Sequence, residues 1–344
     1  MNEWIQDYAL FFAQVLTLLA MLAAIMVMVS KGRGQGEAGS QLRVEELNLR
    51  QRKRVRRLKM AVTEPQGRKR LLKGFRRDDK HSRKKNGEES PCGNVWVLDF
   101  HGDLKASGTV RLAEEISALL DVVAEGDEVV LRLESAGGLV HAYGLAAAQL
   151  DRLRDAGVLT RICVDKVAAS GGYMMACCAD RLQVAPFAVL GSIGVVAQVP
   201  NVHRLLKRHD VDVEVLTAGR YKRTLTVLGE NTEEGRDKFL ADIEHTHELF
   251  KRHIAERRPS MDIEQLATGE IWYGREAVDK GLADEVMTSD AYLLARMQDA
   301  RVLSVRLEAQ KRLPERLGLS LSAGVERGVT RLLEAVDASR WLKR

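Results

Sequence analysis

The sequence predicts an α/β fold in which a mainly parallel sheet is covered by helices, preceded by one transmembrane helix and a basic linker. Three observations predict it: an apolar run near the amino terminus, a block of positive charge after it, and apolar strand-like runs that alternate with helix-like runs from residue 94 onward. Strands that are apolar through most of their length and are separated by helices are typical of a parallel sheet with both faces covered.

The first expected element is a membrane span. Residues 9–29 read ALFFAQVLTLLAMLAAIMVMV, in which only Gln14 and Thr17 are polar. At a rise of about 1.5 Å per residue, a helix of this length crosses a hydrocarbon layer of roughly 30 Å. A cleaved signal peptide is the alternative, but acidic instead of basic residues precede the run and no small-residue cleavage site follows it. We therefore expect a retained anchor in residues 1–30.

The positive charge of the chain is concentrated just after this span. Residues 41–86 contain 18 Lys or Arg and 5 Asp or Glu, whereas the whole chain has a net charge of +5. Each cationic side chain near anionic lipid is worth about 1 kcal/mol, so we expect the linker of residues 31–91 to lie along the membrane. Nucleic-acid binding is the alternative, but Phe75 is the only aromatic residue of the basic segment and no known module is present.

The remaining chain is expected to form a folded domain at residues 92–300 and an amphipathic tail at residues 301–344. The tail suits core packing, oligomer contact or a membrane surface. Periodicity predicts strands at residues 94–102, 127–135, 159–168, 181–186 and 211–219. It predicts helices at residues 109–124, 141–157, 170–180, 203–210 and 232–259.

A serine and two glycines mark the point where one of these strands gives way to a helix, in VDKVAASGGYMMACCAD. Unpaired N–H groups and the positive end of a helix dipole converge on Ser170, an arrangement that suits an oxyanion. If its hydroxyl attacks a carbonyl, the N–H of Gly171 can donate to the oxygen that becomes negative. Serine is also a favoured helix N-cap, and the local sequence does not distinguish the two roles.

A second glycine pair follows the strand before it, in ESAGGLVHAYG. Because Gly137 and Gly138 also follow a strand and precede a helix, a parallel sheet places them at the same edge as Ser170. Ligands of parallel folds bind beyond the carboxyl ends of the strands, at this edge. Two glycine-rich strand exits at one edge supply two N–H donors.

A nucleophilic serine needs a base, and two residues are candidates. His101 lies at a strand exit, in DFHGDL. Lys222 follows the predicted strand at 211–219 in TAGRYKRTLT, so it is placed to enter the cleft. A lysine acts as a base at neutral pH only where burial lowers its pKa by several units from about 10.4.

Six stretches resemble one known family, in this order: LESAGGLVHAYGLAAAQL, VDKVAASGGYMMACCAD, GSIGVVAQV, TAGRYKRTL, GENTEEGRDKF and GEIWYGREAVDKGLADEV. They resemble the signal peptide peptidase A family of serine proteases, which uses a Ser/Lys dyad on a fold shared with the protease ClpP and with crotonases. The resemblance covers the anchor and almost all of residues 94–285. It implies that Ser170 is the nucleophile, that Lys222 is the base and that Ser192 orients the lysine. It also implies that Gly171, Gly137 and Gly138 are oxyanion and substrate-binding positions.

One departure from the family is visible in the glycine-rich turn. The family usually has proline where Ala136 stands. Proline restricts its own φ and its neighbour, so its absence is expected to loosen the loop without removing the N–H groups.

The resemblance implies a membrane-anchored serine endopeptidase of the bacterial inner membrane that hydrolyses signal peptide remnants or fragments of membrane or misfolded proteins. Half-length members of the family form a homo-oligomeric ring, so we expect Lys222 to act on the Ser170 of a neighbouring protomer. Because Lys and Arg follow the span and none precede it, the positive-inside rule places the catalytic domain in the cytoplasm, although better-known relatives work on the outer face.

No cofactor is expected. The sequence has no P-loop, and its cysteines, at positions 92, 163, 177 and 178, show no zinc or disulfide spacing. The alternatives are a crotonase-like acyl-CoA enzyme, in which Ser170 and Lys222 have no role, a non-enzymatic membrane scaffold, and an adaptor that binds nucleic acid or lipid through the basic block.

Overall fold

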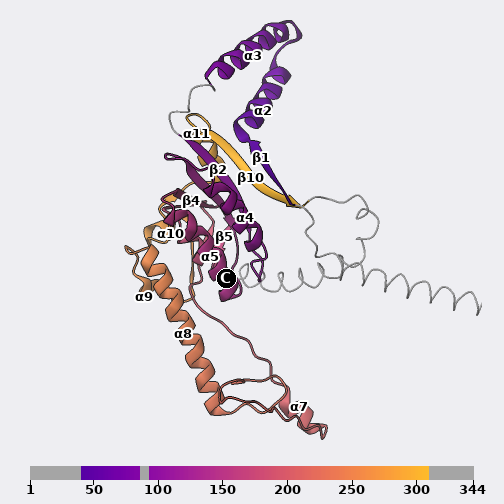
Figure 1. Ribbon diagram of the computed structural model, residues 1–344, viewed down its shortest axis with the longest axis vertical. Coiled ribbons are helices and arrows are strands. Elements are labelled where there is room, and N and C mark those ends of the chain that lie inside the picture. The colour runs from indigo at the N-terminus through magenta and orange to yellow at the C-terminus, as the bar shows by residue number, and fades with distance from the viewer. Residues whose placement is uncertain (1–39, 86–92, 310–344) are drawn as a thin grey trace, which may run out of the picture. The chain divides into compact units, whose positions relative to one another are not determined.

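The structure is a computed structural model that describes residues 40–85 and 93–309 (Figure 1). The expected membrane span at residues 9–29 and the tail from residue 313 lie outside the described residues. None of the described helices is both long and apolar enough to cross a membrane.

The chain divides into two units. Residues 43–306 form one unit, which contains every residue of the site described below; the described residues 40–42 and 307–309 fall in the other.

The main sheet has seven strands in the order β1-β10-β2-β3-β4-β6-β9. Every pair from β10 across to β9 is parallel. The expected α/β fold with a mainly parallel sheet is therefore confirmed. The strands are β1 (Ser40–Glu46), β2 (Asn94–His101), β3 (Glu128–Glu134), β4 (Leu159–Val164), β6 (Arg181–Val184), β9 (Glu285–Val286) and β10 (Arg301–Ala309).

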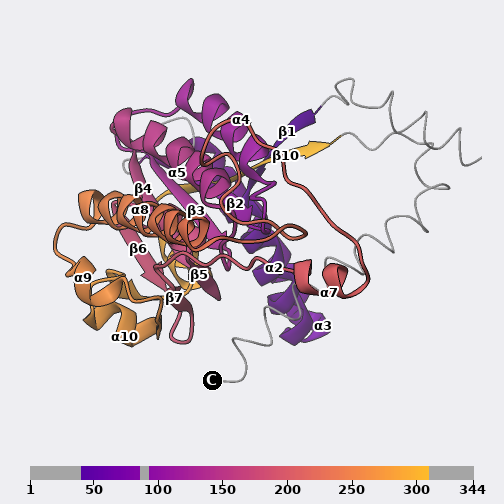
Figure 2. The ribbon, with the colours of Figure 1, turned by 90° about the horizontal axis from the view of Figure 1, so that it is seen from below.

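Helices cover both faces of this sheet. Successive residues of a strand point to opposite faces, so adjacent buried residues pack against different helices. In β2, Leu98 belongs to the larger core cluster, with α4 (Thr109–Leu120) and α5 (Val140–Asp155), which lie side by side (Figure 2). The adjacent Val97 belongs to a second cluster with Tyr292 of α11 (Ser289–Arg296). A strand that packs on both sides reads as a continuous apolar run, as residues 94–102 do.

A small second sheet positions Ser170 and Ser192, which directly follow two of its strands. It contains β5 (Val167–Ala169), β7 (Val189–Gly191) and β8 (Ile271–Tyr273), with β5 and β7 parallel and β8 antiparallel to β7. The single strand expected at 159–168 is therefore wrong, since the chain passes from β4 into β5 of another sheet. Asp165 and Lys166 make this crossing, and they are held by Ser289 and Glu134 respectively.

Seven further helices complete the described part of the chain. They are α2 (Leu47–Val62), α3 (Pro65–Lys85), α6 (Gly171–Ala176), α7 (His203–Arg208), α8 (Glu233–Arg257), α9 (Ile263–Leu266) and α10 (Gly274–Asp279). Thus α2 and α3 lie within the segment expected as a linker, and β10 occupies the first residues of the segment expected as a tail.

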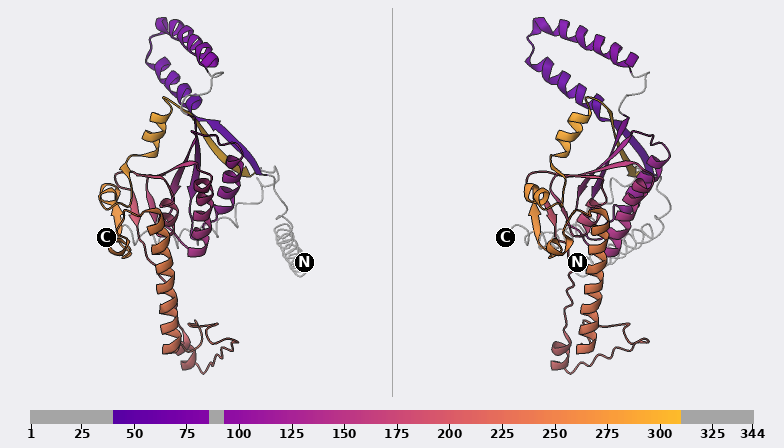
Figure 3. Two further views of the ribbon diagram at one scale, coloured as in Figure 1. Left: turned by 60° about the vertical axis from the view of Figure 1, so that its left-hand side comes forward. Right: turned by 90° about the vertical axis from the view of Figure 1, so that its left-hand side faces the viewer.

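Helix α8 is anchored at one end only. It begins at Thr232, whose side chain accepts a hydrogen bond from the Gly235 N–H, and it ends before Pro259. Its core residues, Phe250 and Ile254, lie near the carboxyl end. The rest of the helix runs away from the sheets, with α7 close to its far end (Figures 1 and 3).

The strand expected at residues 211–219 is not formed, and this segment is irregular. Its sequence VDVEVLTAG alternates as a half-buried strand does, but no described strand pairs with it. Leu216 is 88% exposed. The alternation of apolar and polar residues at 211–219 therefore does not correspond to a buried and an exposed face of a sheet.

Candidate active site

Ser170 occupies a strained position between β5 and α6. It has φ 51° and ψ −119°, in a region that residues other than glycine rarely adopt. Its backbone N–H donates to the Gly191 carbonyl at 2.8 Å, and its own carbonyl accepts from the Met174 N–H at 3.0 Å. The side chain makes no capping hydrogen bond to the helix. The N-cap role left open by the sequence is therefore not used, and the hydroxyl remains available.

The two glycine-rich turns meet beside this serine, as expected. The Ser135 N–H donates to Val167 and the Ser135 carbonyl accepts from Ala169, which ties the end of β3 to β5. Gly137 has φ 91°, and a Cβ there would lie 2.7 Å from the Gly171 nitrogen and 2.8 Å from the Ser170 Cβ. Only glycine allows this approach of one turn to the other.

A buried chain of hydrogen bonds holds the Gly137 turn. The Gly137 N–H donates to Ser135 Oγ at 3.0 Å, Ser135 Oγ lies 2.6 Å from the Tyr143 hydroxyl, and that hydroxyl donates to the Asp103 carbonyl at 2.7 Å. Ser135 and Tyr143 are 1% and 0% exposed. The Gly137 N–H is thus occupied, whereas no hydrogen bond among the described residues uses the Gly138 N–H.

Sequence reasoning missed Ser135 and Tyr143 because their roles depend on contacts between β3, α5 and the Asp103 turn. One signal was present. Tyr143 is the only aromatic residue in the Leu- and Ala-rich run of α5, and a buried tyrosine hydroxyl usually finds a partner. Its ring also packs on Gly171, where a Cβ would lie 2.5 Å from Tyr143 Cγ.

Ser192 lies next to Ser170. The parallel pairing of β5 with β7 ends at Ala169 opposite Gly191, so the two serines directly follow the last pair. Ser192 also has positive φ, 50°, and its N–H donates to the Glu270 carbonyl at 2.6 Å. The structure thus brings both serines together with the glycines of the two turns.

Lys222 is not brought to this cluster within one chain. It is exposed, and its neighbours Arg220 and Tyr221 contact Glu234 in the first turn of α8. The serine helix α6 instead contacts α8 at His253, whose Nε2 lies 2.9 Å from the Met174 carbonyl. The contact at Glu234 and the contact at His253 therefore lie roughly 28 Å apart along α8, because a helix rises about 1.5 Å per residue.

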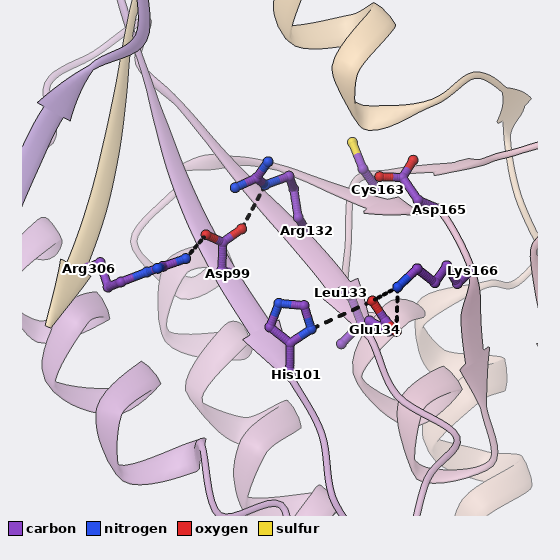
Figure 4. A pocket seen from close by; sticks show the side chains of 9 residues that line it. All are labelled: Asp99, His101, Arg132, Leu133, Glu134, Cys163, Asp165, Lys166 and Arg306. Carbon is purple, nitrogen blue, oxygen red and sulfur yellow. Dashed lines mark hydrogen bonds and ion pairs between the residues drawn. The ribbon is translucent and has the colours of Figure 1, made fainter. Parts of the chain in front are cut away.

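A separate polar pocket of about 200 Å³ lies at the ends of β2, β3 and β4 (Figure 4). Two of its carboxylates are paired with cations: Asp99 binds Arg132 and Arg306, and Glu134 binds Lys166. The pocket is lined by Asp99, His101, Arg132, Leu133, Glu134, Cys163, Asp165, Lys166 and Arg306.

Asp99 is the buried carboxylate of this pocket. Burial raises the pKa of Asp99, but its bonds to the two arginines outweigh burial and hold the pKa below the ordinary value of 3.8. His101, considered above as a base, has a side chain that is 69% exposed and lies 3.6 Å from Glu134. His101 therefore lines this pocket and contacts Glu134, and not Ser170.

Comparison with known sequences defines the class of this protein. Residues 152–303 match peptidase family S49, and residues 3–150 match the amino-terminal part of the same family. The chain belongs to peptidase family S49. It is a peptidase of the serine class, and its substrates are peptides or proteins.

Individual relatives agree with this class. "Probable protease SohB" of Haemophilus influenzae is 46% identical over 328 residues, which cover 92% of this chain and 93% of the relative. The protein of the same name from Buchnera aphidicola (strain APS) is 52% identical over 228 residues, 66% of this chain and 68% of the relative. "Serine protease SPPA, chloroplastic" of Arabidopsis thaliana is 28% identical over 191 residues, 54% of this chain and 28% of the relative. The resemblance to this family, and within it to the SohB branch, is confirmed.

Proposed function

We propose that this chain is a membrane-anchored serine endopeptidase in which Ser170 is the nucleophile and Lys222 is the general base. The observation that carries the proposal is the conformation of Ser170. Its backbone is strained, its hydroxyl is free of capping, and the Gly137 turn packs directly against it. Strained backbone at a strand-to-helix turn is typical of functional sites, where it holds a side chain in a reactive position.

The reaction is acyl transfer to Ser170 followed by hydrolysis. The neutral Lys222 amine takes the hydroxyl proton while Ser170 Oγ forms a bond to the peptide carbonyl carbon. The carbonyl oxygen becomes negative and accepts hydrogen bonds from the N–H groups of Gly171 and Gly138. The lysine ammonium then protonates the leaving amine as the C–N bond breaks, and water hydrolyses the acyl group by the same proton transfers.

The hydrogen bonds of the two turns explain the choice of these two donors. Gly171 is the first residue of α6, and the first N–H groups of a helix have no acceptor within it. The Gly137 N–H is bound to Ser135, which leaves the Gly138 N–H as the second donor. Ser192 is assigned to orient the lysine, because it lies beside Ser170 where the amine must arrive.

The base is supplied by a second copy of the chain. Lys222 stands at the far end of α8, and a helix cannot shorten to bring it to the Ser170 of its own chain. The loop that carries Lys222 exposes apolar side chains, Leu216 at 88%, Leu228 at 48% and Tyr221 at 45%. Such a surface suits contact with another protomer, which supports a homo-oligomeric ring with a shared dyad.

Membrane attachment is part of the proposal. It rests on the apolar residues 9–29 and on the charge of α2 and α3. Residues 47–77 contain 13 Lys or Arg and one acidic residue, Glu64. At the turn between these helices, Leu58 and Val62 are 69% and 85% exposed. Positive charge beside exposed apolar side chains suits an anionic lipid surface.

We place the catalytic domain on the cytoplasmic side of a bacterial inner membrane, where it degrades signal peptide remnants and fragments of membrane or misfolded proteins. Protease added to spheroplasts and to inverted vesicles tests the side. Digestion of the folded domain only in inverted vesicles supports the cytoplasmic side, and digestion in spheroplasts contradicts it.

Complementation between inactive variants tests the shared dyad. Full-length protein in detergent is assayed on an apolar fluorogenic peptide as wild type, Ser170→Ala, Lys222→Ala and an equal mixture of the two variants. Lys207→Ala, an exposed lysine in α7, is the matched control and should keep wild-type activity. We expect each site variant to lose activity and the mixture, after subunit exchange, to regain part of it.

Each other result has a definite meaning. Loss without recovery, in a mixture shown by pull-down to contain mixed oligomers, contradicts a dyad shared between protomers. Full activity in either single variant removes that residue from the mechanism. Unchanged function of both variants in cells would favour the acyl-CoA enzyme or the scaffold.

A further inference from the structure

Three soft donor atoms converge at the carboxyl end of α6, away from the turn that carries Ser170. Cys177 and Cys178 follow the last residue of α6, and His253 comes from α8, 75 residues beyond Cys178. Cys178 Sγ lies 3.9 Å from His253 Nε2. The two sulfur atoms and an imidazole nitrogen all lie within 4.8 Å of one another.

The two thiols of this cluster are shielded from solvent, and the histidine is half-buried. Cys177 and Cys178 are 1% and 3% exposed, whereas His253 is partly exposed and forms the side nearest solvent. All three groups approach a single carbonyl, that of Met174, at 3.2 Å, 3.5 Å and 2.9 Å for Cys177 Sγ, Cys178 Sγ and His253 Nε2. A hydrogen-bonded core is one reading of these contacts, but convergence of two thiols and an imidazole exceeds what capping one carbonyl requires.

The spacing of Cys178 Sγ and His253 Nε2 matches the reach of a metal ion. Bonds of about 2.3 Å to sulfur and about 2.0 Å to nitrogen allow one ion to join a sulfur and a nitrogen up to roughly 4.3 Å apart. The 3.9 Å between Cys178 Sγ and His253 Nε2 lies within this limit. Thiolate and imidazole donors together select Cu(I) and Zn(II) over harder ions.

We propose that Cys177, Cys178 and His253 form a binding site for a thiophilic d¹⁰ ion, Cu(I) or Zn(II), that joins α6 to α8. Binding forms two metal–sulfur bonds and one metal–nitrogen bond and releases the two thiol protons to solvent. The imidazole binds as the neutral ring through Nε2, so the proton that Nε2 donates to the Met174 carbonyl in the free protein moves to Nδ1. The ion undergoes no change of oxidation state.

This site has a direct structural link to Ser170. Helix α6 has six residues, so the serine and the cluster lie at its two ends. An ion that fastens the carboxyl end of α6 to α8 restrains the short helix on which Ser170 is mounted. The inference does not depend on the proposed dyad, because it concerns binding at residues outside the serine turn.

Metal binding is measured on the full-length protein with Cys92→Ser and Cys163→Ser, so that only the paired cysteines remain. Cu(I) is offered in competition with a colorimetric chelator, and Cd²⁺ reports the Zn(II) arm through its sulfur charge-transfer absorption. Cys178→Ser and His253→Ala are compared with His245→Ala, an exposed histidine of the same helix. X-ray absorption at the copper and zinc edges counts the sulfur and nitrogen neighbours.

The expected result is one ion per chain, bound to two sulfur atoms and one imidazole. Affinity should fall more than about tenfold in Cys178→Ser and in His253→Ala and stay unchanged in His245→Ala, since even groups one step removed from a metal change affinity by this much. Copper strongly bound and zinc weak, or the reverse, identifies the ion. Equal binding by all variants, a shell without sulfur, or no binding by protein with native near-ultraviolet circular dichroism overturns the proposal.

Discussion

Replacing Gly137 by alanine tests whether the contact between the two glycine-rich turns positions Ser170. Gly137 has φ 91°, and an added Cβ would lie 2.7–2.8 Å from the Ala169 oxygen, the Gly171 nitrogen and the Ser170 Cβ. The left-handed backbone costs an L-residue about 1–2 kcal/mol. Forcing a methyl group into packed surroundings costs about 1–3 kcal/mol more. The free energy of unfolding should therefore fall by roughly 2–5 kcal/mol.

Thermal unfolding and peptide hydrolysis measure the effect of Gly137→Ala. For a domain of this size, about 2–4 °C is lost per kcal/mol, so thermal unfolding should occur roughly 4–20 °C lower. Displacement of an oxyanion donor lowers kcat by about 10²–10³-fold, measured on a peptide below the new unfolding temperature. Gly144→Ala is the matched control. A Cβ at Gly144 meets nothing within 4 Å, and this helical position should gain about 0.5–1 kcal/mol with kcat unchanged.

The reasoning is refuted if Gly137→Ala keeps the wild-type melting temperature and kcat. A variant that melts lower but hydrolyses peptide at the wild-type rate would confirm the packing and remove the turn from catalysis.

Two further predictions concern buried polar groups. Tyr143→Phe leaves Ser135 and the Asp103 carbonyl without their partner, so the unfolding free energy measured in urea should fall by roughly 1–3 kcal/mol and kcat should fall with it; wild-type values for both would contradict the hydrogen-bond chain. Asp99→Asn should cost roughly 1.5–3 kcal/mol at neutral pH. Because the pKa of Asp99 is held below 3.8, its ionised form stabilises the fold above that pH, and this contribution is lost as pH falls through the lowered pKa. Urea midpoints from about pH 6 to pH 2.5 should therefore fall more steeply for the wild type than for Asp99→Asn, and parallel curves would show that the carboxylate contributes nothing.

The parts of the fold that sequence reasoning predicted are those that local patterns determine. The strands predicted at 94–102 and 127–135 correspond to β2 and β3, and the long helix predicted at 232–259 corresponds to α8. Ser170 was marked by its glycines, which a packed strand-to-helix junction would otherwise not favour. Local pattern and tertiary structure agree at these positions because each element's buried face is set by its own side chains.

The parts that sequence reasoning missed depend on distant partners. Residues 211–219 alternate as a strand does, yet a strand also requires a neighbour for its hydrogen bonds. The crossing from β4 to β5 at Asp165 depends on Ser289, 124 residues away. The distance from Lys222 to Ser170 depends on which end of α8 packs against the core. None of these relations is visible within a window of sequence.

The length of α8 makes it a lever. Its 25 residues span roughly 37 Å, so a tilt of about 5° at the packed end moves the other end by roughly 3 Å, the length of a hydrogen bond. A group carried at that tip cannot be held to chemical accuracy by the packing of Phe250 and Ile254 alone. The amino-terminal end of α8 needs a second contact, and the surface that provides this contact determines how accurately the Lys222 loop is positioned.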